Sequence, residues 1–327
     1  MKSYIVRTIK RKRGSMYEYE YRDKQGKPLS QKRVKEATEG LYLPPALDKV
    51  KINLHKRAKV LAIGYDDKER AQYTYNKRFT EKQSQEKFAH MITLGESYQK
   101  ILRQIQRDMY SEAETKDKQI ATILRFVNDC SFRVGNEKYT KDNKSYGVTT
   151  LEARHVQTKG SEIKVSFTGK KGVHNHCVFR NKKLSKNLRN KKRTLNPNDR
   201  LFTYRKGSRY YNVRPSDVNR YLRKFGDFTT KNFRTWTANI ELINQLVKNP
   251  EIFTDISETQ KKRLVNECID KVAEKLHNTR AVCKSNYLDP RLIETALNDT
   301  KRLRSFQTCA TKEDYTNEYI RFLKKAK

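Results

Sequence analysis

Residues 161–179 read SEIKVSFTGKKGVHNHCVF, in which two runs of alternating character flank the four residues Gly169-Lys170-Lys171-Gly172. This pattern predicts a β-hairpin with strands over 161–168 and 173–179, because glycines supply the backbone conformations that a tight turn needs. The two strands would anchor the turn and present Lys170 at its tip. The predicted hairpin interrupts a part of the chain that otherwise has helical periodicity.

Around the hairpin, apolar residues recur at spacings of three and four. Thr80 with Gln83 resembles a capping box at the start of the first helical stretch, and Ser257 with Gln260 resembles another further on. The C-terminal three quarters of the chain is therefore expected to be mainly helical. The apolar positions behind this prediction are Phe88, Met91, Ile92, Ile101, Leu102, Ile105, Met109, Ile120, Ile123, Leu124, Val127, Val218, Tyr221, Leu222, Phe225, Phe233, Trp236, Ile240, Leu264, Cys268, Val272 and Leu276.

The N-terminal part has short extended runs instead, and we expect a small twisted antiparallel sheet with a helical turn or two. The predicted fold is therefore α+β, with a small N-terminal antiparallel β-sheet domain over 1–78 and a larger, mainly α-helical domain with a β-hairpin over 79–327. The runs that predict strands in the first domain are YIVRTI (4–9), YEYEY (17–21), VKINL (50–54) and AQYTY (71–75).

The charge of the chain points to a polyanionic partner. Lys and Arg number 73 against 37 Asp and Glu, which gives a formal net charge of +36. Self-repulsion at this level opposes compaction, so the excess is expected to have a use. Duplex nucleic acid, with a phosphate charge about every 1.7 Å of its axis, fits better than a small acidic substrate. The basic residues 181–200 are predicted to form a mobile surface connection, either near this polyanion or simply solvated.

Membrane and disulfide signals are weak in the sequence. No window approaches the ~18 apolar residues of a membrane span, and the N-terminus lacks the apolar run of a signal peptide. The cysteines are odd in number, scattered and without a C-x-x-C pair. They predict reduced thiols without a disulfide framework. They are Cys130, Cys177, Cys268, Cys283 and Cys309.

Five side chains in distinct contexts could together hold and attack a phosphodiester without a metal. Each arginine can donate two N–H bonds to one phosphate, and a lysine ammonium crowded by cations can protonate a leaving alkoxide. The same cations would favour a phenolate, and an amide can donate to oxygen charge that develops in the transition state. These residues are Arg133 in SFRVGNEKY, Lys170 in FTGKKGV, Arg234 in KNFRTW, Asn278 in HNTRAV and Tyr287 in KSNYLDP.

Each of these residues taken alone has a simpler reading. Arg133, at a predicted helix end, and Arg234, within a predicted helix, could form structural salt bridges with carboxylates. Lys170 could be an ordinary exposed turn lysine. Tyr287 could be a packing or surface residue, since the chain has 19 tyrosines. The order and context of the whole set carry the functional signal.

In these motifs the chain resembles the type IB DNA topoisomerases of the small poxvirus type, which have bacterial relatives. The similarity runs in order through nearly the whole chain. It implies the catalytic fold shared by tyrosine recombinases and type IB topoisomerases. The matching stretches are PPAL (44–47), QYTY (72–75), FRVGNEKY (132–139), SYGVTTL (145–151), FTGKKGV (167–173), KNFRTW (231–236) and the run from Leu276 to Tyr287.

The resemblance implies a reaction and a role for each residue. Tyr287 would attack a backbone phosphate to give a 3′-phosphotyrosine and a free 5′-hydroxyl. Arg133, Arg234 and Asn278 would stabilise the transition state, and Lys170 would protonate the leaving 5′ oxygen. Rotation about the intact strand would relax supercoils before the 5′-hydroxyl reseals the break, with neither ATP nor a metal required.

The resemblance also implies the partners and the place of action. A monomer would clamp double-stranded DNA, with no membrane and no small-molecule cofactor involved. The location would be intracellular, in a virion, at a cytoplasmic viral replication site or in a nucleus. Lys231 matches a supporting cation three residues before Arg234. The expected DNA contacts are Gln72, Tyr73, Tyr75, Lys138 and Tyr139. For the strand tyrosines Tyr73 and Tyr75, packing in the core is the alternative.

Some residues depart from the family pattern or fall outside it. Asn278 stands where many relatives have histidine, and Arg280 stands where proline is common and could alter the loop before Tyr287. His277 is expected at the surface or behind the residues that touch the phosphate. His174 and His176 share one strand face, but a metal site would need at least one further ligand.

Two other functions remain open at this stage. A tyrosine recombinase or integrase would use the same arginines, lysine and tyrosine, although it usually has H-x-x-R where this chain has Lys231-Asn232-Phe233-Arg234. A non-catalytic basic DNA-packaging protein would form no covalent adduct with DNA. Relaxation of a supercoiled plasmid by a monomer, without paired sites or divalent cations, would exclude the recombinase, and loss of activity in Tyr287→Phe would exclude the packaging protein.

Overall fold

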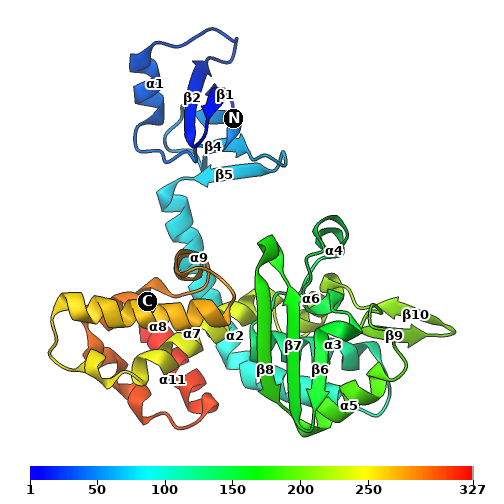
Figure 1. The fold of residues 1–327 in the computed structure, drawn as a ribbon. Coiled ribbons are helices and arrows are strands. Elements are labelled where there is room, and N and C mark those ends of the chain that lie inside the picture. Colours follow the sequence, from blue (N-terminus) through cyan, green and yellow to red (C-terminus); the bar gives the residue numbers. More distant parts are fainter. Residues whose placement is uncertain (326–327) are drawn as a thin grey trace. The chain divides into compact units, whose positions relative to one another are not determined.

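The computed structural model describes residues 1–325 and forms two compact units, Met1–Lys87 and Phe88–Lys327. The first unit is built on strands, whereas helices and small sheets make up the second (Figure 1). The predicted α+β class is therefore confirmed. The long helix α2 (Lys77–Met109) begins in the first unit and continues into the second. The domain boundary predicted at residue 78 stays a prediction.

The first unit is a five-stranded antiparallel sheet in the order β2-β1-β3-β4-β5. Its core lies around Val50 and Ile52, which are fully buried, and α1 (Gln31–Thr38) adds Ala37 to it. The four predicted strands are confirmed, and one more strand lies between the last two of them. The strands are β1 (Tyr4–Arg13), β2 (Met16–Arg22), β3 (Asp48–Asn53), β4 (Val60–Tyr65) and β5 (Ala71–Tyr75).

A buried arginine ties the PPAL stretch (44–47) to this sheet. The Nη2 of Arg7 donates to the carbonyl oxygens of Pro44 and Leu47, both at 2.9 Å. Its guanidinium carbon lies 4.3 Å from the centre of the Tyr19 ring, and Arg7 is only 3% exposed. A buried charge needs hydrogen-bond partners, and the stretch 44–47 provides them as carbonyl oxygens around the Arg7 guanidinium. This stretch therefore has a structural role.

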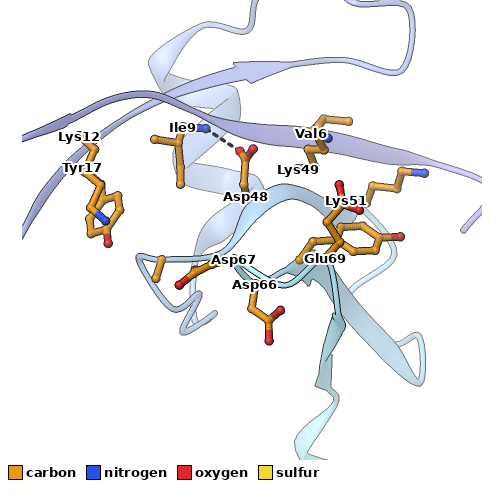
Figure 2. A pocket seen from close by; sticks show the side chains of 12 residues that line it. Val6, Ile9, Lys12, Tyr17, Asp48, Lys49, Lys51, Asp66, Asp67 and Glu69 are labelled. Atoms are coloured by element: carbon orange, nitrogen blue, oxygen red, sulfur yellow. Dashed lines mark hydrogen bonds between the residues drawn. The ribbon is translucent and has the colours of Figure 1, made fainter. Parts of the chain in front are cut away.

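Ala46 of the same stretch lines a cavity of about 730 Å³ on the first unit (Figure 2). Asp48 accepts a hydrogen bond from the Ile9 amide at 2.9 Å, where β1 departs from regular pairing. Acidic and basic side chains share the lining, so the cavity offers no surface of a single charge. The charged residues are Lys12, Lys49, Lys51, Asp48, Asp66, Asp67 and Glu69.

The predicted helices of the second unit are confirmed, with corrections to their ends. Ser257 caps α8 (Glu258–Lys275) by accepting from the Gln260 amide, which is one of the two bonds of the predicted capping box. The predicted cap at Thr80 is wrong, because α2 begins three residues earlier behind Asn76, whose Oδ1 accepts from the Arg78 amide at 2.9 Å. The helices that follow α2 are α3 (Lys116–Cys130), α4 (Glu137–Asn143), α5 (Lys182–Lys192), α6 (Pro215–Arg223), α7 (Thr230–Val247), α8 (Glu258–Lys275), α9 (Arg280–Asn286), α10 (Pro290–Asn298) and α11 (Lys312–Lys325).

The prediction of a mobile connection over 181–200 is wrong for its first half, which forms α5. Asn181 caps this helix by accepting from the Leu184 amide at 2.9 Å. Leu184 and Leu188 are buried four residues apart on one face. The two leucines and the cap help to dock the helix. Lys191 and Lys192 at its end are partly buried, while its other basic residues remain exposed.

The predicted hairpin is confirmed and belongs to a three-stranded antiparallel sheet, β6-β7-β8. Its strands are β7 (Glu162–Thr168) and β8 (His174–Arg180), and β6 (Val156–Lys159) was not expected. The turn between them is the short helix η3 (Lys170–Gly172), where Lys171 and Gly172 have φ of 64° and 75°. A second small hairpin, β9 (Thr203–Lys206) with β10 (Arg209–Asn212), was also missed.

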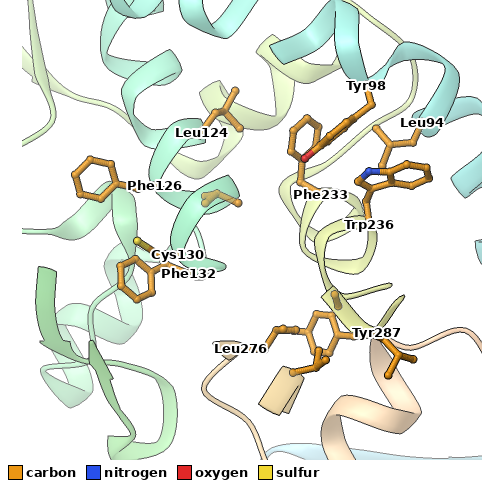
Figure 3. Packing of buried hydrophobic residues seen from close by; sticks show 14 of the residues in the cluster. Leu94, Tyr98, Leu124, Phe126, Cys130, Phe132, Phe233, Trp236, Leu276 and Tyr287 are labelled. Carbon is orange, nitrogen blue, oxygen red and sulfur yellow. The ribbon is translucent and has the colours of Figure 1, made fainter. Parts of the chain in front are cut away.

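Aromatic side chains from several helices fill the core of the second unit (Figure 3). Trp236 of α7 is fully buried, with its ring 5.5 Å from Tyr98 of α2 and 5.1 Å from Tyr319 of α11. Gly95 lets the ring approach α2, since a Cβ there would lie 2.5 Å from a Trp236 ring carbon. This close packing fixes α7, which carries Arg234.

One cysteine expectation is wrong. Cys130 and Cys177 form a disulfide, while Cys268, Cys283 and Cys309 are free. The two bonded residues are 47 positions apart, and only the packing of α3 against β8 brings them together. Separately, none of the helices within the described residues is long and apolar enough to cross a bilayer.

Candidate active site

Arg133 lies on a short extended segment that packs closely against a second extended segment, and a glycine of each lies at the contact. Helix α3 ends at Cys130, and Ser131 turns the chain with a φ of 52°. The carbonyl oxygen of Arg133 then accepts from the Val148 amide at 2.9 Å. A Cβ on Gly147 would lie 2.3 Å from the Gly135 Cα, so glycine is required for this approach. The motifs 132–139 and 145–151 therefore form one structural unit.

The side chains of Arg133 and Asn278 meet, although 145 positions separate them. Nη2 of Arg133 donates to Oδ1 of Asn278 at 2.6 Å. Nδ2 of Asn278 is buried and has no hydrogen-bond partner in the part of the chain that the structure describes. The amide therefore has its acceptor occupied and its donor free.

Arg234 is the most buried cation of the set, at 4% exposed. Nε donates to the carbonyl oxygen of Ser131 at 2.7 Å, Nη2 to that of Leu276 at 3.1 Å, and Nη1 to the Tyr287 hydroxyl at 2.8 Å. None of these acceptors is a carboxylate, which removes the structural salt bridge as the reason for this arginine. Burial, with a further contribution from Arg133, lowers the Arg234 pKa to about 10.

Tyr287 is 7% exposed and lies among the buried residues of the core (Figure 3). Its hydroxyl joins the site through the contact with Arg234. Asn239 of α7 clamps its backbone, because Nδ2 donates to the Tyr287 carbonyl oxygen at 2.9 Å and Oδ1 accepts from the Asp289 amide at 2.7 Å. Asn239 was not predicted from the sequence. Its spacing was the available signal, because it lies three residues after Trp236 and four before Ile243, and a polar group on such an apolar helix face needs partners.

Lys170 stands on the exposed hairpin turn and makes no hydrogen bond or ion pair with any described residue. The strand below it is held by the Tyr146 amide, which donates to the Thr168 carbonyl oxygen at 2.8 Å. Lys231, at the start of α7, is also exposed and unpaired among the described residues. The structure thus joins Arg133 with Asn278 and Arg234 with Tyr287, and leaves both lysines free.

Comparisons with known proteins identify the family of the chain. Residues 76–313 match the family described as "Eukaryotic DNA topoisomerase I, catalytic core". The chain belongs to this family. It is 29% identical to DNA topoisomerase 1B of Acanthamoeba polyphaga mimivirus over 255 residues, which cover 76% of this chain and 75% of that protein. It is 22% identical to DNA topoisomerase 1B of Vaccinia virus (strain Copenhagen), with 72% of each chain covered.

A longer relative shares only part of its length with this chain. DNA topoisomerase 1 of Mycosarcoma maydis is 30% identical over 176 residues, which are 46% of this chain and 17% of that protein. The chain is a DNA topoisomerase of type IB with small viral relatives, and the resemblance read from the motifs is confirmed. DNA is the substrate class that the family implies.

Two positions were expected for His277 in this topoisomerase, and the first of them, a position free at the surface, is wrong. It is half-buried, and its ring stacks on Phe132 with 5.5 Å between the centroids. Burial is the main cause that lowers its pKa to about 4, with smaller contributions from Arg234, Arg133, His176 and His174. The imidazole is therefore neutral at pH 7 and packs directly behind the Arg133 segment.

The stretch before Tyr287 is a helix, α9, and not the loop that was expected. Thr279 caps it by accepting from the Val282 amide, and Arg280 forms a two-point ion pair with Asp270 of α8, with Nε to Oδ1 at 2.6 Å. Arg280 thus connects the start of α9 to α8. Tyr287 directly follows this helix.

The residues expected to touch DNA on the first unit are exposed on an edge strand, β5. Tyr73 is 52% exposed and Tyr75 41% exposed, with their rings stacked at 5.9 Å, so the alternative of core packing is wrong. Gln72 donates to Asp66 at 3.1 Å. On the second unit, Lys138 and Tyr139 are exposed on α4.

Proposed function

We propose that this topoisomerase relaxes supercoiled duplex DNA by transient single-strand cleavage, with Tyr287 as the nucleophile. The contact of 2.8 Å between Nη1 of Arg234 and the Tyr287 hydroxyl supports this most strongly. A guanidinium that donates to the phenol oxygen orients that oxygen and places a positive charge beside the attacking atom. Because none of the carboxylates in residues 1–325 pairs with Arg234, its charge is also available to a phosphate.

The proposed cleavage step forms one bond and breaks another. The Tyr287 oxygen bonds to phosphorus and loses its proton to solvent, while the bond between phosphorus and the 5′ oxygen breaks. The leaving 5′ oxygen takes a proton from Lys170, whose unpaired ammonium at the hairpin tip is a mobile donor. Religation reverses each transfer. One phosphoester replaces another, so the exchange needs no ATP.

Arg133 and Asn278 would stabilise charge on the non-bridging oxygens. The contact of 2.6 Å between them orients the amide so that its unpartnered Nδ2–H remains available. Donors that are fixed before the reaction stabilise a transition state without the cost of reorganisation. Arg133 and Arg234 would supply positive charge to the pentacoordinate phosphate and Asn278 a neutral N–H donor, so we propose a metal-independent reaction.

Exposed basic and aromatic side chains of both units would bind duplex DNA. The protein would act as a monomer. The net charge of +36 supports binding that depends on salt. We propose that the exposed Gln72 can reach a base edge and that the tyrosines and lysines reach phosphates. The contacts that we propose are Gln72, Tyr73, Tyr75, Lys138 and Tyr139. Lys231, three residues before Arg234, would instead support catalysis as an additional cation.

A relaxation assay tests this proposal. Purified protein should relax a supercoiled plasmid that carries no paired recombination sites, in EDTA and without ATP, while the plasmid stays monomeric. Strand exchange that needs two sites would favour a tyrosine recombinase. Binding without any change in linking number would favour a DNA-packaging protein, and either result would refute the proposed function.

A further inference from the structure

The disulfide joins the two segments that carry Arg133 and Lys170. Cys130 is the last residue of α3, three positions before Arg133, and Cys177 lies on β8 of the Lys170 hairpin. The loop that the bond closes therefore contains both Arg133 and Lys170. It also contains the 145–151 stretch, which pairs with the Arg133 segment.

The bond acts on the strand of the hairpin that has fewer backbone partners. In the order β6-β7-β8, β8 is the edge strand and pairs only with β7. Cys177 lies opposite Val165, and three further residue pairs follow before the turn. Packing of Phe126 against Phe179 at 5.5 Å supports the same strand, but the disulfide is its covalent attachment to α3.

The hairpin turn is rigidly connected to β8. Asn175, which is 3% exposed, donates from Nδ2 to the Val173 carbonyl oxygen at 2.8 Å. The same amide packs on Gly169, where a Cβ would lie 2.3 Å from Nδ2. The Gly169 amide donates to the Val173 carbonyl oxygen at 2.8 Å. A shift of β8 would therefore be transmitted to Lys170.

We propose that the Cys130–Cys177 disulfide is a positioning crosslink for DNA cleavage, which holds the Lys170 hairpin in register with the Arg133 segment. This inference rests on the proposed role of Lys170 as the general acid. A dithiol would release the crosslink by thiol–disulfide exchange: the S–S bond takes two electrons and two protons to give two thiols, and the dithiol becomes a disulfide. Cys177 is partly exposed, which gives a small dithiol access.

The test compares two substrates in single-turnover cleavage, with protein purified without reductant and then treated or not treated with dithiothreitol. One duplex carries the ordinary 5′ oxygen at the cleavage site, and the other carries a 5′-bridging sulfur, which leaves without a proton. Displacement of a catalytic group by about 1 Å can cost up to about 100-fold in rate. We expect reduction, or Cys177→Ser, to slow cleavage of the oxygen substrate about tenfold or more and to leave the sulfur substrate unchanged.

Matched variants and thiol counts complete the experiment. Cys309→Ser, which removes a free and partly buried thiol, should keep the full response to dithiothreitol. Thiol titration of the unfolded, untreated protein should find three free thiols. Five free thiols, an unchanged oxygen rate after reduction, or equal slowing of both substrates would each overturn the inference. If Cys177→Ser does not fold, reduction of the wild-type protein gives the same comparison.

Failure of the proposed function would look different. Lys170→Ala that cleaves the oxygen substrate as fast as the wild type would refute the role of Lys170, and the crosslink would then have no acid to position. If Lys170→Ala is slow and is rescued by sulfur while reduction changes nothing, only the role of the disulfide is wrong.

Discussion

The Nη2 of Arg133 lies 2.6 Å from Oδ1 of Asn278, so the arginine occupies the acceptor of the amide and leaves its donor free. This relationship gives Asn278 one hydrogen-bonding task on each side. It accepts from a neighbouring cation, and it can donate to a phosphate oxygen. A histidine at this position could perform both tasks with its two ring nitrogens.

Substitutions at Asn278 can separate these two tasks. Asn278→Asp keeps the acceptor for Arg133 but removes the N–H donor, so single-turnover cleavage should slow by about 10²–10³-fold. Asn278→His keeps both a donor and an acceptor, and its cleavage rate should stay within about tenfold of the wild type. DNA affinity measured at the same salt serves as the control. An aspartate variant as fast as the wild type would contradict the role of the donor.

Removal of the Lys170 ammonium should affect only the departure of the 5′ oxygen. A positioned general acid contributes about 10²–10⁴-fold, so Lys170→Ala should slow cleavage of ordinary DNA by that amount. A 5′-bridging sulfur should restore the rate, since a thiolate leaves without a proton. Lys171→Ala, on the neighbouring turn residue, is the matched control and should keep most of the activity. Lack of rescue by sulfur would mean that another group is the acid.

More of the site residues than of the residues that support them could be predicted from the sequence. The hairpin, Arg133 after a helix and Arg234 within one could all be predicted, because alternation, helical period and turn residues are local signals. The approach of Cys130 to Cys177 could not, since it depends on how α3 packs on β8. Asn239 was missed for a similar reason, because its partners lie 48 and 50 positions further along the chain.

Two secondary-structure errors have local causes. Helix α5 was hidden by its basic residues, because only Leu184 and Leu188 mark its buried face. Strand β4 contains Gly64, and glycine weakens the β signal of a short run. In the structure a Cβ at Gly64 would lie 2.8 Å from a Val50 methyl carbon, so tertiary packing explains a residue that local propensity disfavours.

Gly95 should tolerate no side chain, because the Trp236 ring and Ile320 occupy the space next to it. An added Cβ would lie 2.5 Å from the ring and 2.7 Å from Ile320. Overpacking of this kind costs about 1–3 kcal/mol, so Gly95→Ala should lower the free energy of unfolding by that amount. Ser97→Ala on the same helix is the control for helix propensity. Denaturant titration measures both, and equal stability of the two variants would contradict the packing.

Protonation of His277 should destabilise the fold at acidic pH. Burial lowers its pKa from 6.5 to about 4, so the unfolded chain binds more protons in that interval. The stability that this group contributes is complete above pH 6.5 and is lost as the pH falls toward 4. His277→Phe keeps the stacking on Phe132 without a titration. As the pH falls from 6.5 to 4, the Tm of this variant should therefore fall less than that of the wild type. Parallel curves of Tm against pH would contradict the lowered pKa of His277.

The identity of the residue that attacks DNA is the most direct test of the proposed mechanism. Protein trapped on a cleaved duplex should be digested and the peptide attached to DNA sequenced by mass spectrometry. We predict a 3′-phosphate linked to Tyr287, and no adduct from Tyr287→Phe, which should still bind duplex DNA in a salt-dependent way. An adduct on another residue, on the 5′ end, or in the phenylalanine variant would contradict the mechanism.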